Sequence, residues 1–346
     1  MSSMVKVARE ANVAVSTVSL TLNHRERVKP ETRQRIEEAM QRLGYRPREK
    51  KNAPKPKSIT LRIAFIYTLE SLNPIEDPKM TSYCREVISG MQDYMAGSAS
   101  FLSVFRGVDH VDHDLMVNEQ INAKEFDGVI LFGADSRNGY LERLMQSNLP
   151  MVVINRLPEH GRFSCVTLDY YGGAQLALEH LIGLGHRRIA AATQDTSGKW
   201  LVRENCDATR DTLKKHGIEP VIDIKTEDLG SPTYMKQLCK EVKEKGVTAL
   251  FTGDYFAVSC VNALTDMGLR VPEDVSVVGF DDRGLTTKGG LSLTTIGYDK
   301  RRMGRMAIRM LQRLSQSRGK IKWLSSAVAT HLVKGQTTAK VTDGAE

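Results

Sequence analysis

The sequence has little of what marks a secreted, membrane-spanning or metal-binding protein. Its five cysteines are widely spaced and include no C-x-x-C pair, so neither a disulfide framework nor a zinc site underlies the fold. No hydrophobic run approaches the length of a membrane span, and the N-terminus has no secretory hydrophobic region. We therefore expect a cytoplasmic protein with no metal or membrane partner, whose cysteines are reduced core residues.

Motifs of catalysis and nucleotide binding are missing as well. The chain has no nucleophile elbow, no Walker loop and no G-x-G-x-x-G. Gly172 and Gly173 open a predicted helix, where a turn with close helix packing is favoured over a phosphate site. The segment D-H-V-D-H-D at 109–114 could bind a metal, but consecutive loop residues seldom converge on one ion, which favours a solvated loop. We expect no enzymatic activity and no cofactor.

Positive charge is concentrated at one end of the chain. The first 57 residues hold fourteen Lys and Arg and six Glu, a net charge of +8, whereas the remaining 289 residues hold 35 basic and 35 acidic side chains. A basic segment on an electroneutral body is typical of a module that binds duplex DNA, because each phosphate that it neutralises releases condensed counterions.

The same basic segment has the pattern of a helix-turn-helix. Val7 and Ala11 lie on the apolar face of a first helix, and Asn12 stands at a turn that needs a positive φ. Val18 belongs to the core face of a second helix, whose outer face is slim and rich in hydroxyl groups, as a major groove requires. A third helix is predicted at 30–43. A small three-helix cap would show the same pattern, and the charge favours DNA binding.

The rest of the chain predicts an α/β fold. Residues 48–58 are charged and broken by prolines, which is typical of a linker. Beyond them, apolar runs alternate with helical stretches, which indicates parallel sheets covered on both faces and, given their length, two lobes. We expect strands at 59–68, 101–105, 128–132, 151–154, 188–192, 249–252 and 275–279, and helices at 171–184, 234–245, 256–267 and 302–314.

Three long motifs carry a resemblance to one known family. They are V-A-R-E-A-N-V-A-V-S-T-V-S-L-T-L-N at the N-terminus, G-G-A-Q-L-A-L-E-H-L-I-G-L-G-H-R-R-I-A at 172–190 and G-L-R-V-P-E-D-V-S-V-V-G-F-D-D at 268–282. They are similar to signatures of the lactose-repressor/galactose-repressor family of bacterial transcription regulators. The resemblance implies a helix-turn-helix headpiece (1–47), a linker (48–58) and a two-lobed sensor (59–340) of the periplasmic-binding-protein type. The sensor lobes are then joined by three crossovers, hold a ligand cleft between them and supply the dimer seam.

The resemblance also assigns DNA contacts to the second helix. Leu20 stands where the family commonly has Arg, and it cannot make the bidentate pair to guanine, which is worth about 1–3 kcal/mol of discrimination. Leu20 can pack against a thymine methyl instead, so we expect an operator unlike the common one. The DNA-binding residues are expected to be Val15, Ser16, Thr17, Ser19, Leu20, Asn23, Arg27 and Lys29.

The linker departs from the family pattern. Relatives place a leucine-bearing hinge helix there, whereas Pro54 aligns with that leucine and Pro56 follows it. Proline inside a helix costs ~3 kcal/mol. We therefore expect the hinge helix to be absent or shortened, which leaves open how the sensor is coupled to DNA.

Polar residues after the strands of the sensor are the expected ligand contacts. Asp281 matches the first Asp of the family's G-F-D-D motif, and Asn205 stands where relatives have an arginine, with Arg203 two residues away. The expected effector-binding residues are Asn155, Arg203, Asn205, Asp254 and Asp281. Carboxylates accept hydrogen bonds from sugar hydroxyls, which favours a small polyhydroxyl effector. Alternatively, these acids only cap helices.

Together these features predict a transcription regulator that binds a two-fold operator as a homodimer and acts as a repressor. One headpiece offers few base contacts, so affinity requires two half-sites. An alternative is a regulator that has lost small-molecule sensing and responds to a protein partner or to DNA occupancy alone. A solute-binding protein is disfavoured by the basic headpiece and the lack of an export signal.

Overall fold

A computed structural model describes most of the chain and divides it into two compact units. The units are Met1–Ser58 and Ile59–Glu346. The described residues are 4–14, 17–18, 21, 28, 30–43, 60–68, 78–107, 125–132, 140–147, 149–156, 163–195, 200–225, 231–317 and 319–341. Within these ranges, no helix is both long and apolar enough to cross a lipid bilayer.

The first unit is a small helical cluster. Helix α1 (Met4–Glu10) packs on α3 (Pro30–Arg42) through Val7, Ile36 and Ala39, and Val18 completes this core. Asn12 adopts a φ of 50°, which confirms the positive φ that its place in the turn predicts. Arg35 donates a hydrogen bond of 2.6 Å to the carbonyl of Ala11, and so satisfies an orphan carbonyl at the end of α1.

The first lobe of the second unit is built on an all-parallel sheet of six strands. Their order is β11-β5-β4-β3-β1-β2. One face packs on α4 and α11 and the other on α6, so both faces of the central strands are buried. The elements are β1 (Arg62–Thr68), α4 (Pro78–Met95), β2 (Phe101–Gly107), β3 (Gly128–Phe132), α6 (Tyr140–Gln146), β4 (Met151–Ile154), β5 (Ser164–Leu168), α11 (Lys300–Ser317) and β11 (Ser325–Val328).

The second lobe holds a second six-stranded sheet, in the order β12-β10-β9-β8-β6-β7. Five strands are parallel, and β12 runs antiparallel to β10 at the edge. Helix α7 covers one face, while α9 and α10 pack together with the strands of the other. The elements are α7 (Tyr170–Gly183), β6 (Ile189–Ala191), α8 (Trp200–Lys215), β7 (Ile222–Asp223), α9 (Pro232–Glu244), β8 (Ala249–Phe251), α10 (Asp254–Asp266), β9 (Ser276–Phe280), β10 (Thr294–Tyr298) and β12 (Thr330–Val333).

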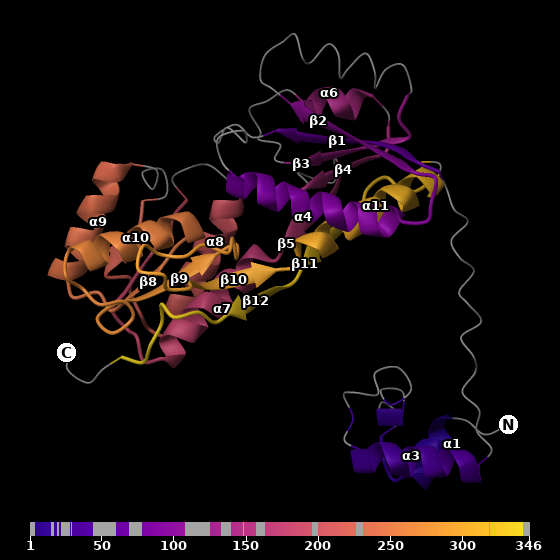
Figure 1. Cartoon of the computed structure of the whole chain (residues 1–346), viewed down its shortest axis with the longest axis horizontal. Coiled ribbons are helices and arrows are strands. Elements are labelled where there is room, and N and C mark those ends of the chain that lie inside the picture. The colour runs from indigo at the N-terminus through magenta and orange to yellow at the C-terminus, as the bar shows by residue number, and fades with distance from the viewer. Residues whose placement is uncertain are drawn as a thin grey trace. The chain divides into compact units, whose positions relative to one another are not determined.

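The chain passes between the lobes three times, as the resemblance implies. It leaves the first sheet after β5, returns to it through α11 and β11, and crosses again to β12. Figure 1 shows α4 and α11 lying side by side under the first sheet, although about 200 residues separate them in sequence. Gly90 and Gly304 allow this approach, because a Cβ at either would lie within 2.0 Å of a backbone oxygen of the facing helix.

The seven expected strands are present, with ends that differ by up to three residues. Strands β5, β7, β10, β11 and β12 and helices α4, α6 and α8 were not among the expected elements. The parallel sheets that the sequence predicts are present, and β12 is an added antiparallel strand at the edge of the second sheet. It is short and its exposure alternates little, so it carries no clear strand pattern of its own.

Candidate functional site

Of the expected DNA-binding residues, only Thr17 lies among the described residues. Val15, Ser16, Ser19, Leu20, Asn23, Arg27 and Lys29 lie outside them, as does the linker at 48–58. The backbone N–H groups of Thr17 and Val18 donate to the carbonyl of Ala14 at 2.9 and 3.3 Å. Helical hydrogen bonding of the second helix therefore begins at Ala14, where the sequence supplies no side-chain cap.

Three of the five expected effector residues lie just after the carboxyl ends of strands. Asn155 follows β4 in the first lobe, while Asp254 follows β8 and Asp281 follows β9 in the second. Asn205 lies in the N-terminal half of α8, the helix that follows β6. In parallel sheets these ends share one edge, which is where ligands of open α/β folds bind.

Asp281 forms an ion pair with Arg283 at this edge. The Oδ2 atom of Asp281 lies 3.0 Å from an Nη atom and 3.2 Å from Nε of Arg283. Burial disfavours the charged form of Arg283, but the attraction of the Asp281 carboxylate outweighs that effect, so the pKa of the Arg283 guanidinium is raised. The guanidinium also lies 4.9 Å from the ring centroid of Tyr255, a cation–π contact. The pair is thus a preorganised group of acceptors and donors without net charge.

Asp254 supports this loop from behind. It is 2% exposed, and its two carboxylate oxygens accept hydrogen bonds from the Thr295 hydroxyl at 2.5 Å and from the Arg283 backbone N–H at 2.8 Å. Burial raises the pKa of Asp254 to about 6 despite these hydrogen bonds. Because both oxygens are already in use, the geometry favours a role in positioning Arg283.

Aromatic side chains join the two lobes beside the ion pair. The Tyr170 hydroxyl donates to Oδ1 of Asn155, and the Tyr170 ring stacks on Phe280 of the second sheet at 5.7 Å. Tyr83 of α4 meets Tyr298 of β10 edge-on at 6.2 Å. Burial holds the pKa of Tyr83 above its usual range. The charge of Asp281 raises the pKa of this hydroxyl further, whereas the charge of Arg283 lowers it. We call Tyr83, Asn155, Tyr170, Asp281 and Arg283 the inter-lobe junction.

The two expected residues of α8 differ in exposure. The side chain of Arg203 is exposed, whereas Asn205 is partly buried. The Oδ1 atom of Asn205 and the Nη1 atom of Arg283 are both buried, and neither has a hydrogen-bond partner among the described residues. The Arg283 nitrogens that contact Asp281 are Nε and Nη2. Buried polar atoms without a partner are costly unless a ligand or a water satisfies them.

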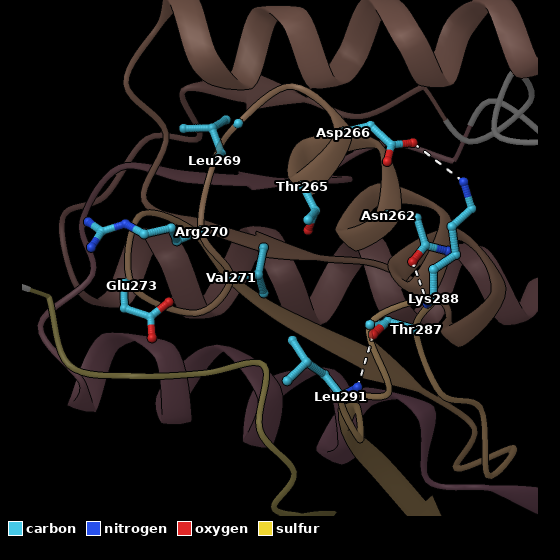
Figure 2. Close-up of a pocket in the computed structure, with 12 residues that line it drawn as sticks. Asn262, Thr265, Asp266, Leu269, Arg270, Val271, Glu273, Thr287, Lys288 and Leu291 are labelled. Carbon is cyan, nitrogen blue, oxygen red and sulfur yellow. Dashed lines mark hydrogen bonds and ion pairs between the residues drawn. The ribbon is translucent and has the colours of Figure 1, made fainter.

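A separate cavity of about 500 Å³ lies at the opposite edge of the second sheet, between the end of α10 and the loops that precede β9 and β10. Figure 2 shows contacts among some of its polar groups: Lys288 pairs with Asp266 at 3.4 Å, and the Lys288 backbone N–H donates to Asn262 at 2.8 Å. The cavity lining includes none of the expected effector residues.

Sequence reasoning missed Arg283 and the tyrosines of the junction. Arg283 directly follows the Asp281-Asp282 pair, so its position after a strand end was a usable signal. Tyr83 and Tyr170 gave no signal of their own, and neither did Tyr298, which meets Tyr83, because the three come from elements far apart in sequence. Their meeting depends on the crossovers between the lobes.

Two family models match this chain. The model "Bacterial regulatory proteins, lacI family" matches residues 3–48, and the model "Periplasmic binding protein-like domain" matches residues 178–338. Among curated relatives, catabolite control protein A of Priestia megaterium is 27% identical over 88% of this chain and 90% of its own length. The HTH-type transcriptional repressor PurR of Aliivibrio fischeri is 28% identical over 90% of this chain and 91% of its own length.

Solved structures agree with the fold. A complex of the transcriptional regulator CelR with cellobiose has a TM-score of 0.65 at 23% identity and covers 97% of this chain and 100% of its own. A lac repressor dimer bound to operator and an anti-inducer has a TM-score of 0.62 at 23% identity, covering 98% of this chain and 99% of its own. At this identity the likeness concerns the fold.

Proposed function

We propose that this chain is a transcription repressor of the lacI type that binds operator DNA as a homodimer and responds to a small neutral polyhydroxyl effector. The support is that a lacI-family model matches its N-terminal segment, a periplasmic-binding-protein-like model matches much of its sensor, and a curated relative over 90% of its length is a transcriptional repressor. No enzymatic step is part of this role. The headpiece (1–47) binds one operator half-site, residues 48–58 link it to the sensor, and residues 59–340 bind the effector and the second subunit.

The DNA-binding part of the proposal rests on the headpiece. The headpiece and the linker together carry a net charge of +8 over the first 57 residues, which supplies affinity for phosphates, while the second helix supplies the base contacts. The proposed DNA-binding residues are those expected from the sequence: Val15, Ser16, Thr17, Ser19, Leu20, Asn23, Arg27 and Lys29.

The observation that supports the effector proposal is that two buried polar atoms lack a hydrogen-bond partner among the described residues, one on Arg283 after β9 and one on Asn205 of α8. The Arg283 Nη atom is a donor and the Asn205 Oδ1 atom is an acceptor, so a ligand that satisfies both must accept one hydrogen bond and donate another. A hydroxyl group does both. Asp281 offers further acceptors, and the Asp281–Arg283 ion pair itself carries no net charge. These properties support a neutral polyhydroxyl compound over an anion.

A thermal-shift screen tests the effector proposal. Neutral sugars, sugar acids and nucleobases are each added to the full-length protein, and a compound that binds only the native state raises the melting temperature by mass action. At a concentration of about 100 times its Kd the expected stabilisation is about 2.7 kcal/mol. We expect a neutral sugar to give the largest shift.

Two variants assign that shift to the junction. Asp281→Asn is expected to remove most of it, since the ion pair that holds Arg283 in place is lost. Asp266→Asn, a carboxylate of the same lobe at the opposite sheet edge, should keep the full shift. If no compound stabilises the wild type, or if Asp281→Asn keeps the full shift, the regulator that lacks small-molecule sensing becomes the better account.

A further inference from the structure

One edge of the first sheet gathers basic side chains that no other part of the proposed function uses. All six strands are parallel, so the segments that lead into them share this edge. The second unit begins here, because Leu61 directly precedes β1. The end of α11 lies here too: Leu311 packs against Gly128, the first residue of β3, and Gln312 accepts a hydrogen bond of 3.0 Å from Tyr94.

Helix α11 carries a row of arginines along its outer face. Arg302, Arg305, Arg309 and Arg313 are spaced by three and four residues, so they share one side of the helix, opposite the buried residues Met303, Ala307, Met310, Leu311 and Leu314. Arg305 pairs with Asp299 at 2.9 Å and with Asp93 at 3.8 Å. Arg309 and Arg313, toward the sheet edge, are exposed and have no acidic partner among the described residues.

The loop after α11 extends this row. Ile321 and Leu324 pack on the core, so Lys320, Lys322 and Trp323 between and beside them are exposed. The loop is fixed at the edge by the Leu324 N–H, which donates to Ser164 of β5 at 2.9 Å. We call Arg309, Arg313, Lys320 and Lys322 the basic edge.

Little negative charge offsets the basic edge. In the described segments that lead into the six strands, the acidic residues are Glu125 and Asp127, and Asp127 is held by Arg62 at 3.3 Å. The sensor is electroneutral as a whole, so the basic edge is a local concentration of charge. Unpaired exposed arginines and lysines of this kind are suited to phosphate groups.

The chain tethers this edge to the headpiece. Residues 48–58 span at most roughly 40 Å at about 3.3–3.6 Å per residue. Duplex DNA rises 3.4 Å per base pair, so a tether of this reach brings the edge within about 12 base pairs of the headpiece site.

We propose that the basic edge binds phosphates of the duplex that flanks the operator, adding a sequence-independent contact to that of the headpiece. This proposal rests on the DNA-binding function. It adds affinity and salt dependence, not base specificity, because phosphate contacts carry no sequence information. It also gives the sensor a DNA contact that does not require a hinge helix.

The test compares duplexes of two lengths. A site is selected from a random-sequence library with the full-length protein and prepared as the protected site alone and with about 12 added base pairs on each side. Kd is measured by fluorescence anisotropy over a series of salt concentrations. For the wild type we expect tighter binding and a steeper salt dependence with the long duplex, by about 0.9 in the logarithmic slope per added phosphate contact.

Charge removal assigns the difference to the basic edge. The variant R309Q/R313Q/K320Q/K322Q should bind both duplexes alike, with its affinity for the short duplex kept. The matched control K214Q/K225Q/K236Q/K340Q removes four exposed lysines elsewhere on the sensor and should behave as the wild type. The variant R309K/R313K, in which Lys320 and Lys322 are unchanged, should still bind the long duplex more tightly than the short one, since Lys also binds phosphate as a point charge.

The outcomes separate the two proposals. Equal wild-type affinity for long and short duplexes, or an unchanged length effect in the four-fold glutamine variant, would overturn the basic edge while leaving operator binding in place. Failure of the wild type to select any sequence would instead contradict the operator-binding function itself.

Discussion

At the scale of single residues, Asp254 shows how burial gives a carboxylate a structural task. It ties Thr295 of β10 to the backbone of Arg283, and its position under the loop keeps Arg283 beside Asp281. A Cβ on Gly279 would lie 2.1 Å from the Oδ1 atom of Asp254, so strand β9 needs a glycine there to leave room for the Asp254 side chain. The contact therefore depends on three elements of the second lobe.

The raised pKa of Asp254 makes stability depend on pH. A carboxyl whose pKa is higher in the folded state favours folding while it is protonated. Its contribution is complete below the ordinary value of 3.8 and is lost as pH rises through about 6, a total of roughly 3 kcal/mol. Asp254→Asn does not titrate, so the wild type should lose stability relative to this variant between about pH 4 and pH 7, measured by urea unfolding.

The control for this prediction is Asp266→Asn, at the exposed end of the same helix. It should keep the wild-type decrease in unfolding free energy over that pH range. If the difference between wild type and Asp254→Asn is the same at both ends of the range, the raised pKa is wrong.

At the scale of elements, α7 fits the second sheet through a glycine that has no room for a side chain. A Cβ on Gly173 would lie 2.7 Å from the Phe280 ring and 3.1 Å from Ile296. Its neighbour Gly172 donates its N–H to the Asp169 cap at 2.8 Å. The two glycines thus serve a helix start with close packing, the interpretation that the sequence favoured over phosphate binding.

Gly173→Ala is expected to destabilise the protein by about 1–3 kcal/mol, because the added methyl displaces Phe280 and overpacks the core. Phe280 stacks on Tyr170, so the junction should loosen as well. Thermal or denaturant unfolding measures the change.

The same helix provides the matched control. Gly183 also lies in α7, and nothing lies within 4 Å of the Cβ that an alanine would add. Gly183→Ala should therefore leave stability unchanged or raise it by up to about 1 kcal/mol, the ordinary effect of Ala over Gly in a helix. Similar losses for both variants would contradict the packing argument.

At the scale of the whole molecule, the two compact units predict separable functions. Deletion of residues 1–57 removes the net positive charge and the headpiece core, but leaves both sheets of the sensor with their covering helices. The truncated protein should unfold cooperatively near the wild-type temperature in calorimetry. It should lose sequence-specific DNA binding in a mobility-shift assay.

Retention of sequence specificity by the truncated chain would show that the headpiece is not the reader. Loss of cooperative unfolding would show that the sensor depends on the N-terminal unit. Weak, salt-sensitive binding without sequence preference is compatible with the basic edge, whose phosphate contacts lie in the sensor.

The sequence by itself determined the features that depend on local pattern and on charge. The position of Asn12 predicted its turn, the charge count placed the basic segment, and the apolar runs predicted seven strands of the two sheets. These signals lie within a few residues of one another, so no knowledge of the fold is needed to detect them. Short, weakly patterned strands such as β7 and β12 were not predicted, because pairing with neighbouring strands, and not their own residue pattern, specifies them.

Only the tertiary structure decided which polar residues at the strand ends are buried and which form the ion pair with Arg283. In sequence, Asp254 and Asp281 are equivalent acids after strands, yet packing buries Asp254 behind the loop and leaves Asp281 paired with Arg283. The fold also carried α11 back to the first sheet and so aligned its arginines with the edge where the sensor begins. Burial and proximity between distant segments are properties of the packed chain, because they arise from contacts that local sequence patterns do not encode.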